Sequence, residues 1–433
     1  MPSPGIEILF VGDIHLGKSP SRLPDDLDKA EHSPAAAWRN TVDRAIEDEV
    51  DAVVLAGDVV ESVKDRFEAL PELEAGVRRL ADARIRTLGV AGNHDVEALP
   101  SLARLIPEFH LLGAGGQWEV QTLHGKDGGE VDLCGWSFNK QEVQNSPLES
   151  FDRKPRDGVP MLGVVHGDLD RPGSRHAPIA RTELENSALD GWFLGHIHKP
   201  DALQMPRPIG YLGSISGVDF GPGERGLHGP WKVRVEGEHL SLLEQLPLAP
   251  LRYERLDVPI DDLEVDGERT TEEVVVAAIL AAARARAEGV VAFGAQLLRA
   301  LALRVHLTGR EPRPGFLAAV TLTNGDDLLR THVGDLRIFC ERIVTDARLA
   351  IDLEATARGT DPMGLLARRI LALESDDEAG RALVNSARSA IEEASDSNAP
   401  AGDEGPEIRE VLLRAAWELL DALRAQRPQR GAA

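Results

Sequence analysis

Trp192-Phe193-Leu194-Gly195-His196-Ile197-His198 is a short apolar run that ends in two histidines one residue apart. The run has the composition of a buried β-strand, and the histidines would follow the end of that strand. Side chains at i and i+2 share one face of a regular strand, and both imidazoles can turn toward one cavity where the backbone bends away from the pleat. A single His-x-His pair is weak evidence, because two histidines without a shared ligand are the commoner outcome. How strongly the pair indicates a metal site depends on which residues follow the other strands.

Four other apolar runs of strand length, at 6–11, 52–56, 85–90 and 161–165, also end in potential metal ligands. The residues that follow these runs are Asp13, His15, Asp58, Asn93, His94 and His166. Helical patterns at 34–49 and 65–83 separate the first three runs, which predicts an α/β layered domain. Ligands gather beyond the carboxyl ends of strands in such domains, so we expect these groups to meet there.

The ligand types predict a centre for divalent metal ions. Carboxylate, imidazole and amide groups suit Mn, Fe or Zn, and no thiolate is offered that would select a softer metal. One carboxylate can bridge two ions about 3.5–4 Å apart, and such a pair can hold a hydroxide as nucleophile. Seven of these eight residues can divide between two ions with Asp58 in the middle. We expect two ions, and Mn, Fe and Zn are alternatives.

These motifs resemble the signature of the calcineurin-like metallophosphoesterases, which is D-x-H, G-D, G-N-H-D/E, a lone H and G-H-x-H. The corresponding segments here are Asp13-Ile14-His15, Gly57-Asp58, Gly92-Asn93-His94-Asp95, His166 and Gly195-His196-Ile197-His198. The resemblance implies an α/β fold in which two layered sheets form a sandwich flanked by helices. It also implies two-metal hydrolysis of a phosphoester.

The resemblance further implies a role for each matching residue. One ion would be held by Asp13, His15 and His198, the other by Asn93, His166 and His196, with Asp58 bridging them. His94 would not bind metal but would stabilise the transition state or protonate the leaving oxygen as general acid. Asp95 could tune His94 through a hydrogen bond, because an imidazole near two dications needs a carboxylate partner to remain protonated.

Within this family, the chain is most similar to the SbcD-type DNA repair exonucleases. The Asp13-Ile14-His15-Leu16-Gly17 form and the Gly195-His196-Ile197-His198-Lys199-Pro200 string carry the similarity. It implies a DNA exonuclease or endonuclease that works with an SbcC-type coiled-coil ATPase subunit. It also implies a homodimer formed by the helices at 34–49 and 65–83. Candidate contacts to substrate phosphate are Lys18, Arg39 and Lys199.

Glu61 departs from the pattern of this group. Some members place a histidine three residues after the bridging aspartate, where it orients the substrate phosphate, and Glu61 stands there in this chain. A carboxylate facing an anionic substrate argues against strong nuclease activity, although bacterial members commonly have an acidic residue at this position. His176 is a further histidine of interest, because it lies in the loop after His166.

The chain of 433 residues is long enough for two or three domains. We predict a catalytic domain at 1–247, a small α+β capping module at 248–356 and a helical C-terminal region at 357–433. The motifs cover residues 1–245, so the resemblance beyond them rests on position and architecture. The apolar stripe of a helix at 406–425 would suit docking on a partner, and packing on its own domain is an equal alternative.

The negative net charge of the chain leaves two other functions as alternatives. Lys+Arg 48 against Asp+Glu 72 gives a net charge of −24, which argues against a surface coated with phosphate-binding groups. A metal site supplies its own positive charge, however. The alternatives are a hydrolase of a small phosphoester, as phosphodiesterase or phosphatase, and a non-catalytic subunit of an ATPase complex.

Cysteine usage and the absence of long apolar runs predict a cytoplasmic protein. Cys134 and Cys340 are far apart in apolar segments, so buried thiols in a reducing compartment are expected. The N-terminus lacks the pattern of a signal peptide, and no apolar run approaches about 18 residues.

Overall fold

The computed structural model describes residues 5–265, 267–292, 297–312, 316–320, 331–348, 350–375, 377–394 and 405–426. The chain falls into two compact units. One unit comprises Met1–Asp257, Val276–His306 and Leu322–Val344, and the other comprises Val258–Val275, Leu307–Thr321 and Thr345–Ala433. The division into domains at 1–247, 248–356 and 357–433 stays a prediction.

Two β-sheets form the centre of the first unit. The six-stranded sheet has the order β11-β10-β1-β2-β3-β4, and the five-stranded sheet has the order β5-β6-β7-β8-β9. The strands of the first sheet are β1 (Gly5–Val11), β2 (Ala52–Ala56), β3 (Arg86–Val90), β4 (Phe109–Leu111), β10 (Trp231–Glu236) and β11 (His239–Gln245). Those of the second sheet are β5 (Glu119–His124), β6 (Glu130–Trp136), β7 (Met161–His166), β8 (Gly191–Gly195) and β9 (Ile209–Tyr211).

Neighbouring strands are parallel from β1 to β4 and again from β6 to β9. The antiparallel neighbours are β10 beside β1, β11 beside β10, and β5 beside β6. The carboxyl ends of the parallel strands therefore share one edge in each sheet. This edge is where the sequence predicts ligands to gather.

An apolar core fills the space between the two sheets. Ile8 and Phe10 of β1 belong to this core, whereas Leu9 and Val11 belong to the core on the outer face of the same sheet. This alternation follows from the two-residue period of a strand. The ring of Phe10 stacks on Phe193 of β8 with the ring centroids 3.9 Å apart. The sandwich that the family resemblance implies is thereby confirmed.

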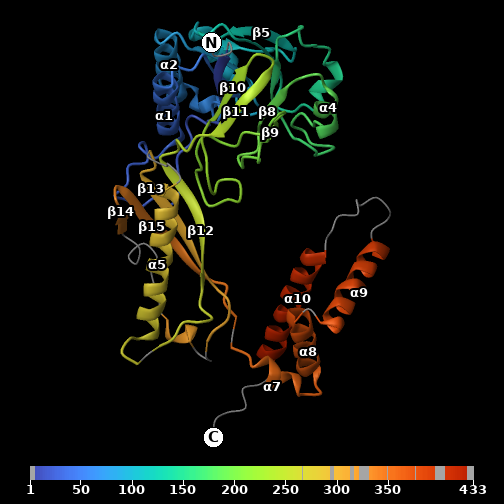
Figure 1. The fold of residues 1–433 in the computed structure, drawn as a ribbon. Coiled ribbons are helices and arrows are strands. Elements are labelled where there is room, and N and C mark those ends of the chain that lie inside the picture. The colour runs from blue at the N-terminus through green and yellow to red at the C-terminus, as the bar shows by residue number, and fades with distance from the viewer. Residues whose placement is uncertain are drawn as a thin grey trace. The chain divides into compact units, whose positions relative to one another are not determined.

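Helices cover both sides of the sandwich. The helices α1 (Pro34–Glu47) and α2 (Arg66–Asp82) lie together on one side, and α4 (Arg181–Asn186) lies on the opposite side (Figure 1). The Ser33 hydroxyl caps α1 by accepting a hydrogen bond from the Ala36 N–H at 3.3 Å. Both long helices match the predicted ranges to within two residues. The short helix α3 (Ala98–Leu105) was not expected.

A third sheet and further helices follow the sandwich along the chain. The sheet has the order β12-β13-β15-β14. Its strands are β12 (Leu251–Pro259), β13 (Ala300–Thr308), β14 (Thr331–Val333) and β15 (Leu336–Thr345), and the helix α5 (Thr271–Ala292) lies between β12 and β13 in sequence. The last helices are α7 (Leu353–Ala357), α8 (Pro362–Ser375), α9 (Glu378–Ala394) and α10 (Gly405–Gln426).

The apolar stripe of α10 has two kinds of environment. Ile408 and Leu420 are buried in clusters with residues of α8 and α9. Val411 and Leu419 are 56% and 53% exposed. Packing on neighbouring helices therefore accounts for one part of the stripe and leaves the other part uncovered in the described structure.

Both cysteines are buried thiols, as the sequence predicts. Burial raises the pKa of the Cys134 thiol to about 12. Among the described residues, no helix has the length and apolar character needed to cross a membrane.

Candidate metal centre

The seven ligands predicted from the sequence lie at the carboxyl ends of strands from both sheets. Asp13 and His15 follow β1, Asp58 follows β2, Asn93 follows β3, His166 ends β7, and His196 and His198 follow β8. All seven side chains are buried or half-buried. The layered fold thus brings together residues as far apart along the chain as Asp13 and His198.

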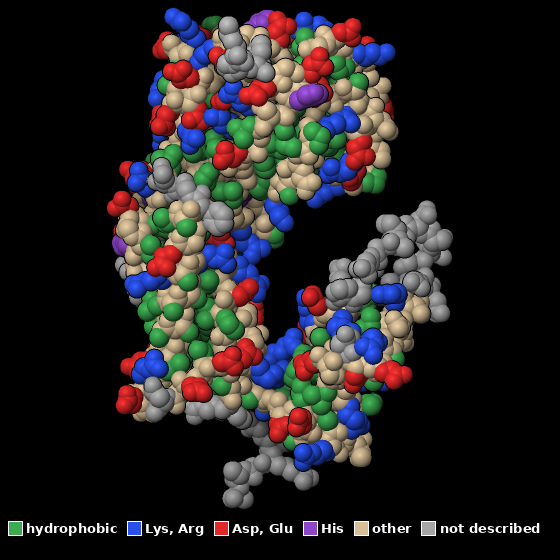
Figure 2. Space-filling model, in the orientation of Figure 1, with side chains coloured by type: hydrophobic (Ala, Val, Ile, Leu, Met, Phe, Trp, Pro, Cys, Tyr) green, Lys and Arg blue, Asp and Glu red, His purple; other side chains and the backbone are tan. Residues whose placement is uncertain are grey.

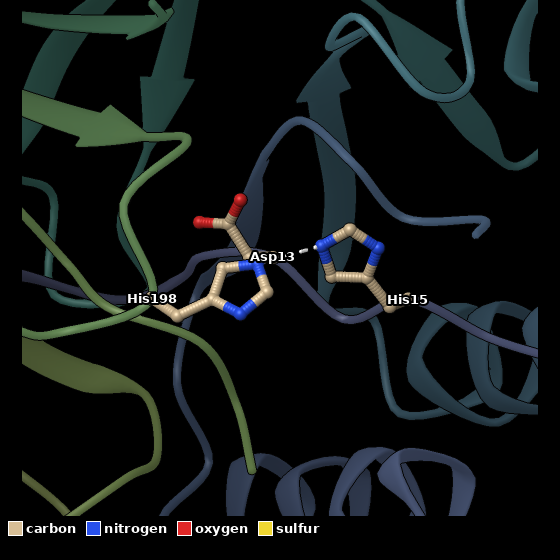
Figure 3. A group of neighbouring side chains, drawn as sticks. All are labelled: Asp13, His15 and His198. Atoms are coloured by element: carbon tan, nitrogen blue, oxygen red, sulfur yellow. Dashed lines mark hydrogen bonds between the residues drawn. The ribbon is translucent and has the colours of Figure 1, made fainter. Parts of the chain in front are cut away.

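The first group consists of Asp13, His15 and His198, which come from the ends of β1 and β8 (Figure 3). One ligand atom from each residue lies within 4.8 Å of the others. The Nε2 atoms of His15 and His198 are 3.0 Å apart, and Asp13 is only 1% exposed. Two imidazole nitrogens this close, beside a buried carboxylate, form a donor set suited to one cation.

The second group consists of Asp58, His166 and His196, whose ligand atoms also lie within 4.8 Å of one another. The Nε2 atom of His166 is 3.1 Å from Oδ1 of Asn93 and 3.3 Å from Oδ2 of Asp58. The same Asp58 oxygen lies 4.0 Å from Nε2 of His15 in the first group. Asp58 therefore stands between the groups, where a bridging carboxylate is expected.

The electrostatics of the two groups fit divalent cations. Burial is the main cause that raises the pKa of Asp13, and the charge of Asp58 adds to it. Burial also opposes ionisation of Asp58, but His166 holds the pKa of this carboxyl below its usual range. Burial alone would lower the pKa of His166, yet Asp58 raises it to about 9. Two buried carboxylates in one pocket need positive charge nearby, and this donor set suits Mn, Fe or Zn.

The backbone leaves regular geometry at the residues that carry ligands. Asp13, His15, Asp58 and His196 have φ angles of 39°, 53°, 48° and 108°. Such left-handed values are costly for residues other than glycine and persist where the surrounding structure enforces them. The turn at His196 separates its ring from that of His198, so the two histidines face different groups.

Two motif glycines leave space for these close approaches. A Cβ atom on Gly92 would lie 2.2 Å from Oδ1 of Asp58. A Cβ atom on Gly195 would lie 2.0 Å from the carbonyl oxygen of Ala56 and 2.8 Å from Nδ1 of His166. Both distances are too short for any larger residue. The glycines of the motifs are therefore required by packing around the ligands.

His94 lies beside the first group and is exposed. Its ring stands edge-on to that of His15, with centroids 5.2 Å apart. Its Nδ1 lies 3.0 Å from the carbonyl oxygen of Glu61. A histidine in this place can reach a bound substrate.

Asp95 does not occupy the position expected from the sequence. It is fully buried, and its oxygens accept hydrogen bonds from the backbone N–H groups of Val59 at 2.7 Å and Gly92 at 2.8 Å. Burial and then the charge of Asp58 raise the pKa of Asp95 to about 7. The expected hydrogen bond to His94 is replaced by contacts that tie the loop after β2 to the loop after β3. Because these backbone N–H groups donate to it, the Asp95 carboxylate fixes the two loops that carry the neighbouring ligands Asp58 and Asn93.

Glu61 is directed toward a ligand. Its Oε2 lies 2.7 Å from Nδ1 of His15 and 3.7 Å from Nζ of Lys18. The contact with His15 is the main cause that lowers the pKa of Glu61. The carboxylate of Glu61 is therefore paired with His15 and Lys18. Its charge is then no argument against the binding of an anionic substrate.

The remaining candidate residues differ in their surroundings. Lys199 is exposed directly after His198. Arg39 pairs with Glu72 at 2.8 Å on the outer helices, so its charge is already neutralised there. The ring of His176 lies 5.1 Å from that of His196, measured between centroids.

Sequence reasoning missed two carboxylates that contact the His-x-His pair. Oδ1 of Asp168 lies 3.4 Å from Nε2 of His196, and Oε1 of Glu224 pairs with Nδ1 of His198. Asp168 follows His166 by two residues, and this proximity to a ligand was a usable signal. Glu224 lies in a Gly-rich loop 26 residues after its histidine, and no motif marks it.

Comparison with known proteins gives one family. A model described as calcineurin-like phosphoesterase matches residues 6–200. The uncharacterized metallophosphoesterase YhaO of Bacillus subtilis is 26% identical over 212 residues, which cover 47% of this chain and 51% of that protein. The chain thus spans about half the length of this relative.

Two proteins named DNA double-strand break repair protein Mre11 are also similar. The one from Haloferax volcanii is 26% identical over 380 residues, covering 82% of this chain and 77% of that protein. The one from Aeropyrum pernix is 32% identical over 273 residues, covering 59% of this chain and 64% of that protein.

Proposed function

Residues 6–200 are a calcineurin-like metallophosphoesterase domain, and from this premise we propose that the chain is a two-metal phosphodiesterase that cuts DNA. The main support is that the ligands form two groups with Asp58 between them. Two divalent ions in these groups would polarise a phosphoryl oxygen and lower the pKa of a water molecule. We take Mn as the metal, with Fe and Zn as alternatives, because carboxylate, imidazole and amide ligands suit all three.

The proposed roles of the protein's own residues follow from their contacts. Asp13, His15 and His198 bind one ion, Asn93, His166 and His196 bind the other, and Asp58 binds both. The Nδ1 atom of His94 faces the Glu61 carbonyl and donates to it, which leaves Nε2 to meet the phosphoryl or leaving oxygen. His94 thus acts as general acid or transition-state stabiliser. Lys18 and Lys199 contact backbone phosphates and position the strand without reading its sequence.

DNA as substrate, in a repair role, is supported by the relatives. Two of them are named as DNA double-strand break repair proteins, and one of these aligns with 82% of this chain. An SbcC-type coiled-coil ATPase is the proposed partner, with the exposed Val411 and Leu419 of α10 as the docking face. Co-purification of this subunit with the chain, lost in a Val411→Asp and Leu419→Asp double variant, tests the assignment.

A homodimer through α1 and α2 is also part of the proposal. Phe67 on α2 is 72% exposed, so its apolar ring is available for a contact between two copies of this helix. Analytical ultracentrifugation at micromolar concentration tests this assignment. A monomer under these conditions would contradict it.

The decisive experiment is a nuclease assay with single- and double-stranded DNA in the presence of Mn²⁺. The wild type should cleave, and Asp58→Asn should not, because it disrupts both ions. His94→Ala should keep its metal content but lose roughly 10²–10⁴-fold in turnover, the usual contribution of a general acid. Intact DNA after incubation with the metal-loaded wild type would refute the nuclease.

The net charge of −24 favours a second candidate, which keeps the chemistry and changes the substrate to a small phosphoester. Acidic side chains are interspersed with basic ones over the face shown in Figure 2. Hydrolysis of bis(p-nitrophenyl) phosphate without cleavage of DNA would select this candidate. Cleavage of DNA that weakens steeply with added salt would select the nuclease, because salt opposes phosphate binding.

A further inference from the structure

Each histidine assigned to the metal centre has an oxygen atom of another residue within 3.4 Å of one of its ring nitrogens. The pairs are Nδ1 of His15 with Oε2 of Glu61 at 2.7 Å, Nδ1 of His166 with the Ala56 carbonyl at 3.0 Å, Nδ1 of His198 with Oε1 of Glu224, and Nε2 of His196 with Oδ1 of Asp168 at 3.4 Å. Three of the four acceptors are carboxylates. These three, Glu61, Asp168 and Glu224, are called the backing carboxylates below.

A backing carboxylate can control how well a histidine binds metal. A neutral imidazole ligand carries its proton on the nitrogen that does not bind the ion. A carboxylate that accepts this proton fixes the tautomer, orients the ring and makes the ligand more basic. The effect should reach only the ion that this histidine binds.

Asp168 is placed to act on His196 alone. It is 4% exposed, and its Oδ2 accepts a hydrogen bond from the Ser174 hydroxyl at 2.5 Å. Its Oδ1 is buried, has no hydrogen-bond partner among the described residues, and faces His196. The side chain is therefore anchored by one oxygen and offers the other to the imidazole. The guanidinium of Arg171 lies 3.5 Å from the same Oδ1 at the surface side.

Glu224 is held in the same manner beside His198. Its Oε2 accepts a hydrogen bond from the Val218 N–H at 3.1 Å, and its Oε1 meets Nδ1 of His198. Its side chain is 12% exposed. The His-x-His pair thus has one anchored carboxylate for each ring.

We propose that Asp168 and Glu224 are positioning residues that set the affinities of the two ion sites separately. Asp168 acts through His196 on the ion held with Asp58 and His166. Glu224 acts through His198 on the ion held with Asp13 and His15. The inference rests on the two-ion centre of the proposed function, and it does not depend on the substrate.

The test measures Mn²⁺ binding to the full chain by electron paramagnetic resonance and by elemental analysis after gel filtration. Asp168→Asn and Glu224→Gln should each weaken one of two Mn²⁺ sites by about 10–100-fold and leave the other site unchanged. Asp132→Asn is the matched control, because Asp132 is a buried carboxylate that bonds to Thr122 and Arg156 and not to a ligand of the centre, and it should bind Mn²⁺ within about threefold of wild type. Asp168→Glu keeps a carboxylate and should recover part of the lost affinity.

Double variants separate positioning from a general structural effect. In a His196→Ala background, Asp168→Asn should cause no further loss of Mn²⁺ affinity, whereas Glu224→Gln should still weaken the remaining site. Coupling of this kind is expected only for residues that act through one another. Thermal melting of the metal-free variants by circular dichroism shows whether each variant folds.

Three results would overturn the inference. One is an equal loss at both sites in either single variant, which would indicate a structural defect. Another is additive loss from Asp168→Asn in the His196→Ala background. The third is a wild type with three ions, one of which Asp168→Asn removes, because Asp168, His176 and His196 would then be ligands themselves. A wild type that binds two ions and leaves DNA intact would refute the nuclease and not this inference.

Discussion

Asp95→Asn distinguishes two roles for Asp95, which are to hold the loops of the ligand groups or to act on the neighbouring His94. Its carboxylate accepts hydrogen bonds from the Val59 N–H at 2.7 Å and the Gly92 N–H at 2.8 Å. These bonds fix the loops that carry Asp58 and Asn93, so the residue should serve both ion sites. We expect Asp95→Asn to lower the stability of the domain and the affinity of both sites together.

The size of the effect follows from these contacts. Oδ1 accepts from Gly92, and Oδ2 accepts from Val59 and more weakly from Val60 at 3.4 Å. Asparagine keeps one accepting oxygen and turns an NH₂ group toward the donors on the other side, so at least one strong bond is lost. A hydrogen bond to a charged group contributes about 1.5–3 kcal/mol, and a buried donor without a partner adds to the loss. The raised pKa of Asp95, about 7, means that its ionisation costs the metal-free fold stability at pH 8, and asparagine removes this cost. The comparison is therefore made on the Mn²⁺-loaded protein, where the charge of the ions offsets that cost. There we expect a loss of about 2–3 kcal/mol, which corresponds to roughly 4–12 °C in Tm for a domain of this size.

The assay combines differential scanning calorimetry at pH 8 with Mn²⁺ titration. Asp132→Asn is the matched control, because Asp132 is also a buried carboxylate but bonds to Arg156 and Thr122. It should lower the Tm without changing Mn²⁺ affinity. If Asp95→Asn keeps its Tm and its metal but loses turnover, Asp95 acts on the reaction through His94 and the reasoning here is wrong.

Three further outcomes are expected. The pKa of His166 is raised to about 9 in the metal-free protein, so Mn²⁺ must displace a proton and its affinity should rise between about pH 6.5 and pH 9. Isothermal titration calorimetry in buffers of different ionisation enthalpy measures the released proton, and heats independent of buffer would contradict the assignment. Cys134, with a pKa of about 12, should resist a thiol reagent at pH 8 until the protein is unfolded, and immediate labelling of the native state would refute its burial. Gly195→Ala should abolish stable Mn²⁺ binding and cost about 1–3 kcal/mol, because its Cβ would lie 2.0 Å from the Ala56 carbonyl, whereas Gly237→Ala, at a turn with open space, should bind normally.

The ligand positions could be predicted because they depend on local patterns. Each follows an apolar strand, and parallel strands in a layered fold carry their carboxyl ends to one edge. The long helices were predictable for a related reason, since an apolar stripe marks both and a Ser-Pro start marks α1. The helix α3 has only eight residues, which is too short for its period to stand out from the surrounding loops.

The partners of the carboxylates could not be read from the sequence. Asp95 was expected to contact the neighbouring His94, yet backbone donors from two loops surround it. Glu61 was expected to face the substrate, and it contacts His15 instead. Which donor a carboxylate meets depends on loop conformation, and here several loop residues have left-handed φ angles that no periodic pattern indicates.

The His196 and His198 pair shows how a local sequence pattern and the loop conformation of the folded protein together determine the site. The sequence places both rings at the end of β8, and in a regular strand they would share one face. The φ angle of 108° at His196 separates them, so each ring enters a different ligand group. Each ring then meets its own carboxylate, Asp168 or Glu224. Under the proposed function, a two-residue spacing would thus supply one ligand to each of two ions, and the distance between the two ligand groups is set by backbone geometry that only the folded sandwich can enforce.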